Sequence, residues 1–104
     1  MYEYFDFDYS SAEFTWDDEK AAANFTKHGV RFETAIKIFY DPNKLIREDE
    51  EHLEEERFDV IGKAGKVLFV VCTIHEDNKV RIISARKANT EEKRRYENGE
   101  SYDA

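Results

Sequence analysis

The sequence predicts an α+β domain in which an N-terminal αα-hairpin packs on a four-stranded antiparallel sheet and a short C-terminal helix follows. Three observations support this class. Apolar residues recur at helical spacing before Pro42, strand-like apolar runs follow Lys44, and an acidic turn after the N-cap candidate Thr90 begins the last helix. The 104 residues suit one domain with a single core.

The first part of the chain is expected to form one short strand and two helices. Residues 14–16 have the composition of a strand. Asp17 is a suitable N-cap for a first helix whose apolar stripe includes Phe25, and Gly29 is a natural C-terminal stop. Residues 32–39 repeat apolar side chains at i, i+3, i+4 and i+7, which predicts the second helix of the hairpin.

Four strand candidates follow in the order of a meander. They cover residues 44–47, 57–61, 67–73 and 80–85. Ala64-Gly65 is a turn signal before the third candidate, and residues 75–78 form the turn before the fourth. In the fourth candidate, Val80, Ile82 and Ser84 are expected on one face and Ile83 and Ala85 on the other. Apolar residues on both faces indicate a strand that is covered on both sides.

Two arginines at the ends of this fourth strand suggest a site. Arg81 and Arg86 are separated by an odd number of positions, so strict alternation predicts that they leave the strand on opposite faces. A guanidinium beside a buried strand needs a carboxylate, a phosphate or water. Two interpretations stay open: structural arginines in salt bridges, or a phosphate-binding site on a rigid strand.

Charge is unevenly distributed along the chain. The formal net charge is −8, which by itself disfavours binding to nucleic acid. Residues 1–19 carry seven acids and no base, whereas residues 60–95 carry nine bases and four acids. Local field rather than net charge decides whether a polyanion can bind, so nucleic acid remains a possible ligand.

Several classes of protein are disfavoured by composition. The longest apolar run, Val67-Leu68-Phe69-Val70-Val71-Cys72, is far too short to span a membrane, and the N-terminus does not read as a signal peptide. A single cysteine indicates no internal disulfide and favours the cytoplasm. Cys72-x-x-His75 is half of a zinc-binding pattern without a second half, so no metal and no cofactor are expected.

The ordered elements resemble a known family, the BrnT-type toxins of bacterial type II toxin–antitoxin systems. The resemblance rests on the following residues, in chain order: Phe14-Thr15-Trp16-Asp17, Lys20, Asn24, Lys27-His28-Gly29-Val30, Phe32-Glu33, Ala35, Phe39, Asp41, Glu55-Glu56-Arg57, Gly62, Thr73, Arg81-Ile82-Ile83-Ser84-Ala85-Arg86, Ala88, Glu92 and Tyr96. It covers residues 14–96 of a single domain spanning residues 1–104. The chain departs from the pattern in its acidic and aromatic residues 1–12 and in its very acidic residues 48–56.

The resemblance implies a RelE-like fold and a ribonuclease that blocks translation by cleaving mRNA. It also implies inhibition by a small antitoxin, BrnA, which carries a ribbon-helix-helix part that binds DNA. RNA is then the substrate, DNA is contacted only through the antitoxin, and no membrane is involved. Residues 1–12 are either a disordered tail or an aromatic segment that lies on a hydrophobic surface.

Cleavage of RNA by its own 2′-hydroxyl requires a base, cations near the phosphorus and an acid for the leaving oxygen, but no metal. The candidate groups are Lys20, His28, Arg57, Arg81, Arg86 and Tyr96. Arg57 and Arg81 share a sheet face if the register allows it. Each of the other types also has a structural interpretation: Lys20 as a solvated helix residue, His28 as a helix cap, and Tyr96 as a ring closing the core.

Two functions from different classes fit these observations. The first is a metal-independent endoribonuclease toxin that is neutralised by its antitoxin. The second is a non-catalytic module that keeps the toxin fold and binds a partner, for example as a co-repressor. The acidic balance of the chain is the one feature that favours the second function.

Overall fold

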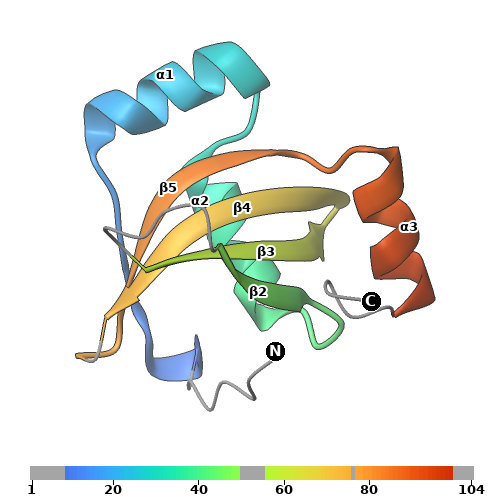
Figure 1. Cartoon of the computed structure of the whole chain (residues 1–104). Coiled ribbons are helices and arrows are strands. Elements are labelled where there is room, and N and C mark those ends of the chain that lie inside the picture. The colour runs from blue at the N-terminus through green and yellow to red at the C-terminus, as the bar shows by residue number, and fades with distance from the viewer. Residues whose placement is uncertain (1–8, 50–55, 76, 100–104) are drawn as a thin grey trace.

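A computed structural model describes residues 9–49, 56–75 and 77–99. Most of the acidic extension and of the acidic connection at residues 48–56 therefore lies outside the described residues. The elements are η1 (Tyr9–Ser11), β1 (Glu13–Thr15), α1 (Asp18–His28), α2 (Phe32–Ala35), η2 (Ile36–Tyr40), β2 (Leu45–Asp49), β3 (Arg57–Ala64), β4 (Lys66–His75), β5 (Lys79–Lys87) and α3 (Thr90–Asn98), where η denotes a 3-10 helix. Figure 1 shows their arrangement.

The described strands form one five-stranded mixed sheet in the order β1-β5-β4-β3-β2. The predicted α+β class and the meander of β2 to β5 are confirmed, but the prediction of a four-stranded antiparallel sheet is wrong. The short strand β1 joins the edge and runs parallel to β5, with Phe14 opposite Val80. Three residues carry too little periodicity to predict a partner so distant in sequence.

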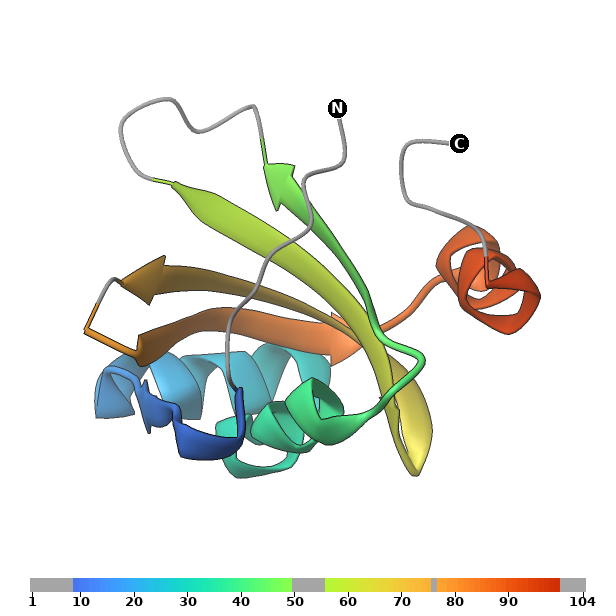
Figure 2. The same cartoon turned by 90° about the horizontal axis from the view of Figure 1, so that it is seen from below.

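The predicted αα-hairpin is also wrong, because α1 packs on β5, and the segment from α2 to η2 packs on β5 and β3. Figure 2 shows α1, α2 and η2 on one side of the sheet and α3 near one end of it. Asp17 and Gly29 bound α1 as predicted: the Asp17 carboxylate accepts from the Lys20 N–H at 3.0 Å, and Gly29 is left-handed with φ 71°. The predicted apolar stripe fails at Phe25, which is 42% exposed, while Asn24 is buried instead.

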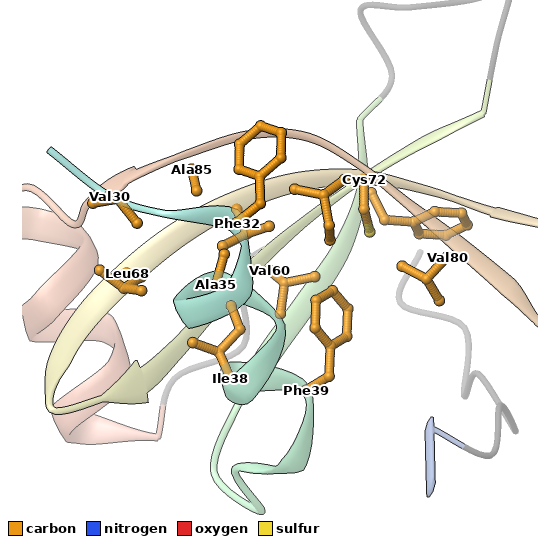
Figure 3. Packing of buried hydrophobic residues seen from close by; sticks show 13 residues of the cluster. Val30, Phe32, Ala35, Ile38, Phe39, Val60, Leu68, Cys72, Val80 and Ala85 are labelled. Carbon is orange, nitrogen blue, oxygen red and sulfur yellow. The ribbon is translucent and has the colours of Figure 1, made fainter. Parts of the chain in front are cut away.

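The hydrophobic core lies between the sheet and the segment from α2 to η2. Phe32, Ile38 and Phe39 lie there in one cluster with Val60 and Leu68 (Figure 3). The predicted second helix consists of one α-helical turn followed by a 3-10 helix. This segment lies so close to β3 that a Cβ on Gly62 would be 2.7 Å from the Cβ of Ile38.

A one-residue bulge in β5 changes which way its side chains point. Val71 lies opposite Ser84, and the next residue, Cys72, lies opposite Ile82, so Ile83 is an extra residue in β5. The bulge shifts the alternation by one position. Ala85 consequently lies in the same core as Val80 and Ile82, and the predicted pattern with Ala85 on the other face is wrong.

The bulge also decides on which face of the sheet the two arginines of β5 lie. Arg81 lies opposite Thr73 and Arg86 opposite Phe69, and these two β4 residues are an even number of positions apart. Arg81 and Arg86 therefore leave β5 on the same face, and the prediction of opposite faces is wrong. We call this face, turned away from α1 and α2, the arginine face; by the register it carries Arg47, Arg57, Arg81 and Arg86.

No helix in the described part of the chain is long and apolar enough to cross a membrane.

Candidate functional site on the arginine face

Arg57, Thr73 and Arg81 form a row across three adjacent strands of the arginine face. Arg81 is paired with Thr73, and Arg57 lies one position beyond the pair of Phe58 and Cys72, which aligns it with Thr73. Neighbouring strands are about 4.8 Å apart, so the two arginine Cα atoms are about 10 Å apart. Two guanidiniums at this spacing can reach one phosphate from both sides.

Arg81 is the exposed end of this row. Within the described ranges of the chain, it makes no hydrogen bond and no ion pair. It lies near the start of α1, because it pairs with Thr15, two residues before the N-cap Asp17. The pKa of Asp17 is lowered mainly by the backbone N–H of Lys20 and further by the charges of Lys20 and Arg81. Lys20 is exposed on the first turn of α1, so the structure brings two predicted cations to one end of the sheet.

His28 does not belong to this group. It lies in the last turn of α1, about 12 Å along the helix axis from Lys20. A histidine in this position interacts favourably with the helix dipole, which favours the structural interpretation.

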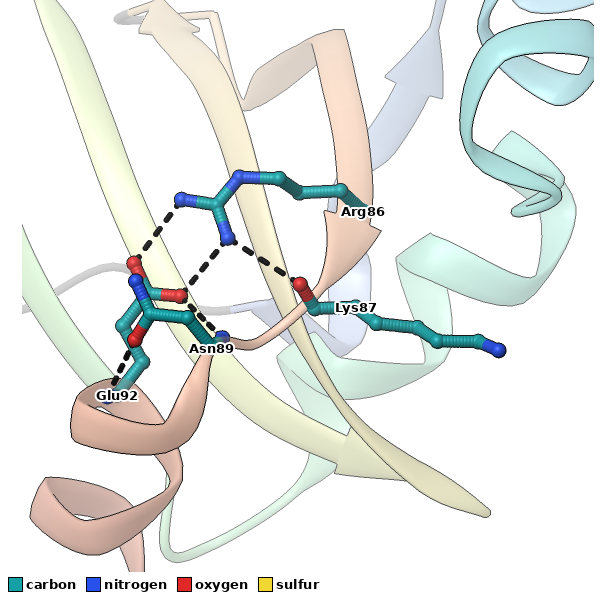
Figure 4. A network of polar contacts seen from close by, with 4 residues as sticks. All are labelled: Arg86, Lys87, Asn89 and Glu92. Atoms are coloured by element: carbon teal, nitrogen blue, oxygen red, sulfur yellow. Dashed lines mark hydrogen bonds and ion pairs between the residues drawn. The ribbon is translucent and has the colours of Figure 1, made fainter.

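Arg86 lies on the same face as Arg81 but is held by protein groups (Figure 4). Its two terminal nitrogens donate to the two carboxylate oxygens of Glu92 at 2.8 and 3.0 Å, and its guanidinium lies 4.2 Å from the ring centre of Phe69. Glu92 is only 8% exposed. This bidentate pair ties the end of β5 to α3, as expected for a structural arginine.

Glu92 has a second role, which corrects the predicted start of the last helix. Asn89 rather than Thr90 is the N-cap. Its side chain accepts from the Glu92 N–H at 2.8 Å, and the Glu92 carboxylate accepts from the Asn89 N–H at 2.8 Å. One buried carboxylate thus holds both the helix start and Arg86.

Tyr96 is also held by a protein group, the carboxylate of Asp41. Its hydroxyl donates to Asp41 at 2.5 Å, and Asp41 accepts in addition from the backbone of Lys63 at 2.8 Å. Burial, together with the hydrogen bond and charge of Asp41, raises the pKa of Tyr96 to about 12. A phenol with a raised pKa is a poorer general acid at neutral pH.

The structure adds a polar pair that sequence reasoning did not single out. Arg47 Nε donates to Asp59 Oδ2 at 3.2 Å, one row from Arg57 and Arg81 on the arginine face. The side chain of Asp59 is 5% exposed, and burial raises its pKa although the hydrogen bond from Arg47 opposes this. The alternation of Arg57 and Asp59 along β3 was the signal that could have indicated this pair.

His75 is the second residue that sequence reasoning missed as a site candidate, because it was considered only as half of a zinc-binding pattern with Cys72. Cys72 is buried in the core, where burial raises the pKa of its thiol, whereas His75 is on the arginine face. The two side chains cannot bind one metal from opposite faces. Among the described residues, no three His, Cys, Asp or Glu side chains are clustered as a metal site.

His75 instead borders an open depression beside Arg81. The depression has a volume of roughly 750 Å³ and is lined by Thr15, His75, Asp77, Lys79 and Arg81. The cations in this depression can bind a phosphate. The imidazole of His75 can exchange a proton with a group beside that phosphate.

Comparisons with known proteins identify the family from the sequence and a similar fold from the structure. A search of curated proteins found no relative by sequence. The chain is similar in structure to the crystal structure of the Brucella abortus ribonuclease toxin, BrnT, with a TM-score of 0.60 and 20% identity over 77% of this chain and 100% of that one. The model of the family described as "Ribonuclease toxin, BrnT, of type II toxin-antitoxin system" matches residues 16–92. The chain therefore belongs to the BrnT family of ribonuclease toxins from type II toxin–antitoxin systems.

Proposed function

We propose that this protein is an endoribonuclease that cleaves mRNA on its arginine face and thereby inhibits translation. In the proposed reaction, the 2′-oxygen of a nucleotide attacks the adjacent phosphorus and the bond to the 5′-oxygen breaks. This reaction uses a nucleophile that the substrate supplies, so the protein's task is to position the phosphate, stabilise its charge and move protons.

The observation that carries this proposal is the row of Arg57, Thr73 and Arg81. Arg81 is exposed and makes no ion pair with described residues, so its planar donors can bind the scissile phosphate in a bidentate manner. Arg57 provides a second cation from the opposite side of Thr73, and Lys20 adds positive charge near the start of α1. Arg86 and Tyr96 act as structural residues in this proposal, since both are held by carboxylates.

The proposed partner is a BrnA-like antitoxin that neutralises the toxin and binds DNA, so that the toxin contacts DNA only through the antitoxin. Family membership supports this pairing. The cytoplasm is the proposed location, since both mRNA and the antitoxin are found there.

The experiment replaces Arg81 by lysine, which keeps the charge but removes the planar fork. Removing a preorganised bidentate cation from a transition state costs on the order of 3 kcal/mol, so Arg81→Lys should lower the cleavage rate of single-stranded RNA about a hundredfold. Its melting temperature should stay that of the parent chain, and its expression alone should no longer arrest growth.

Two matched variants separate catalysis from stability. Arg86→Lys should melt earlier, because it loses a bidentate bond to the buried Glu92. Arg94→Lys, on the exposed side of α3, should change neither property. Parental cleavage by Arg81→Lys would show that the arginine face is not the active site. Absence of RNA cleavage by the parent chain would instead favour the non-catalytic partner function.

A further inference from the structure

The proposed reaction needs a group that takes a proton, and the structure limits where this group can be. Tyr96 is bonded to Asp41 with its pKa raised to about 12, and His28 lies at the far end of α1. The other described histidine, His75, lies on the arginine face in the depression that includes Arg81. Imidazole is the side chain whose charge changes most readily near neutral pH.

His75 is oriented by a buried hydroxyl. Its Nε2 lies 3.2 Å from Oγ1 of Thr73, which is 2% exposed and sits between Arg57 and Arg81 in the row. If Nε2–H donates to this oxygen, Nδ1 keeps its lone pair in the neutral ring and gains the proton in the charged ring. The same hydrogen bond then holds the ring in both protonation states, which suits a residue that accepts and returns a proton.

Charged groups from neighbouring strands and a turn lie around His75. From β5, Lys79 lies directly opposite His75, and Arg81 lies on the same face. Asp77, in the turn, balances Lys79 at 3.6 Å, and Glu13 of β1 also lies opposite Lys79. From β3, Arg57 lies beside Thr73. Asp49 of β2 lies opposite Arg57, so the charged groups near the row include both signs.

We propose that His75 is the general base of this site and that Thr73 is its positioning residue. This inference rests on the proposed function. His75 Nδ1 takes the proton of the 2′-hydroxyl while the 2′-oxygen forms its bond to phosphorus. The bond from phosphorus to the 5′-oxygen breaks, the 5′-oxygen takes a proton from water, and the hydroxide that is left takes the proton back from His75. Arg81 holds the phosphate while the base acts beside it.

The test is the pH profile of RNA cleavage by the full chain, between about pH 5 and 9, on a short single-stranded RNA. For the parent chain, the rate should fall as the pH drops through the range in which imidazole becomes protonated. His75→Gln should lower the rate at pH 8 by about a hundredfold. It should also remove the fall in rate at low pH, which is the acid limb of the profile. Its melting temperature should not change, since His75 is exposed.

Further variants distinguish a base from a merely structural residue. Thr73→Val should lower the rate and alter the acid limb, while Thr73→Ser, which restores the hydroxyl, should recover both. His28→Gln is the matched histidine control and should keep the limb. Arg81→Lys should lower the rate at every pH without removing the limb.

The outcomes separate the two ideas. If the parent chain cleaves RNA and His75→Gln cleaves at the same rate with the same profile, His75 is not the base and the inference is overturned, while the proposed function stands. If the parent chain cleaves no RNA at any pH, the proposed function fails and the inference fails with it.

Discussion

Arg81 and Arg86 carry the same side chain on one face of one strand, but their neighbours give them different roles. Arg86 meets both oxygens of the buried Glu92 and the ring of Phe69. Arg81 is exposed beside an open depression. A guanidinium held by a buried carboxylate stabilises the fold, whereas an exposed guanidinium without such a partner can bind a phosphate. The type of residue alone does not distinguish these roles.

The bond between Tyr96 and Asp41 should make stability depend on pH in the alkaline range. The pKa of Tyr96 is raised from 10.0 to about 12, so the folded state holds the phenolic proton more tightly than the unfolded state. This contribution is complete below pH 10 and is lost as the pH rises through about 12. Tyr96→Phe should lower the free energy of unfolding by about 1 kcal/mol at neutral pH. This difference in free energy from the parent chain should disappear by about pH 12.

Urea unfolding of both chains at several pH values would measure this difference. Tyr40→Phe is the control, because Tyr40 is 56% exposed and its ring contact with Phe14 survives the change. If the free energies of unfolding of the Tyr96→Phe and parent chains differ by a constant amount from pH 8 to about 12, the bond between Tyr96 and Asp41 is not the cause of the pH dependence.

The packing of α1 on β5 depends on one amide. Asn24 donates to the carbonyl oxygen of Ala85 at 2.8 Å and accepts from its N–H at 3.1 Å, so the side chain binds β5 as a neighbouring strand would. It also donates to the carbonyl oxygen of Val30 at 3.0 Å. β1 pairs with β5 only from Lys79 to Arg81, and Asn24 satisfies the edge beyond this segment.

Removal of this amide should be costly. Asn24→Ala leaves the buried N–H and carbonyl of Ala85 without their partner, so we expect a loss of about 2–3 kcal/mol in the free energy of unfolding. Lys27→Ala, on an exposed position of the same helix, should change it by less than about 0.5 kcal/mol. Chemical denaturation measures both, and equal losses would show that α1 is held by other contacts.

The bulge at Ile83 determines which residues of β5 share a face. A single extra residue brings Arg81 and Arg86 to one side and Val80, Ile82 and Ala85 to the other. With a regular strand, one of the two arginines would point into the core beneath α1 and α2. The arginine face therefore depends on an irregularity in the pairing of β4 and β5.

The chain combines a net charge of −8 with a basic site, so its acids and bases are segregated. Residues 1–8 contain three acids and five aromatic or apolar neighbours, and Ser11 lies beside the turn before Lys79, bonded to Asn78 at 2.7 Å. Because Ser11 lies close to the open depression beside Arg81, the acids and rings that precede it in the chain can compete with RNA there. We therefore expect deletion of residues 2–8 to strengthen RNA binding.

The gain should be largest at low salt, where charge contributes most. The deletion keeps Tyr9, whose ring packs 5.4 Å from Phe39. Replacement of Glu3, Asp6 and Asp8 by Asn or Gln, with the rings kept, is the control for charge alone. Fluorescence anisotropy with a labelled, non-cleavable RNA measures affinity. Equal affinity of the deleted and full chains would show that this segment does not compete.

The antitoxin pairing can be tested on the whole complex. The edge strand β2 pairs with β3 on one side only among the described strands, and exposed edges are commonly covered by a partner. Co-expression with the small protein encoded beside this chain should yield a complex that survives purification and cleaves no RNA. Separate elution of the two proteins at micromolar concentration would contradict the pairing.

Much of the local structure followed from the sequence. The cap at Asp17, the stop at Gly29 and the turn at Ala64-Gly65 were all predicted and confirmed. These features depend on the preferences of a few neighbouring residues, such as a carboxylate that accepts from a free N–H or a glycine that adopts positive φ.

Pairing between distant segments was decided only by the tertiary structure. The parallel pairing of β1 with β5, the bulge at Ile83 and the bond between Arg86 and Glu92 each depend on which strand or helix lies alongside. A shift of one residue in register reverses every side chain, and local preferences do not determine the register. For this reason the sequence could name Arg57, Arg81 and Arg86 as candidates, but only the folded sheet aligned Arg57 with Arg81 and bound Arg86 to α3.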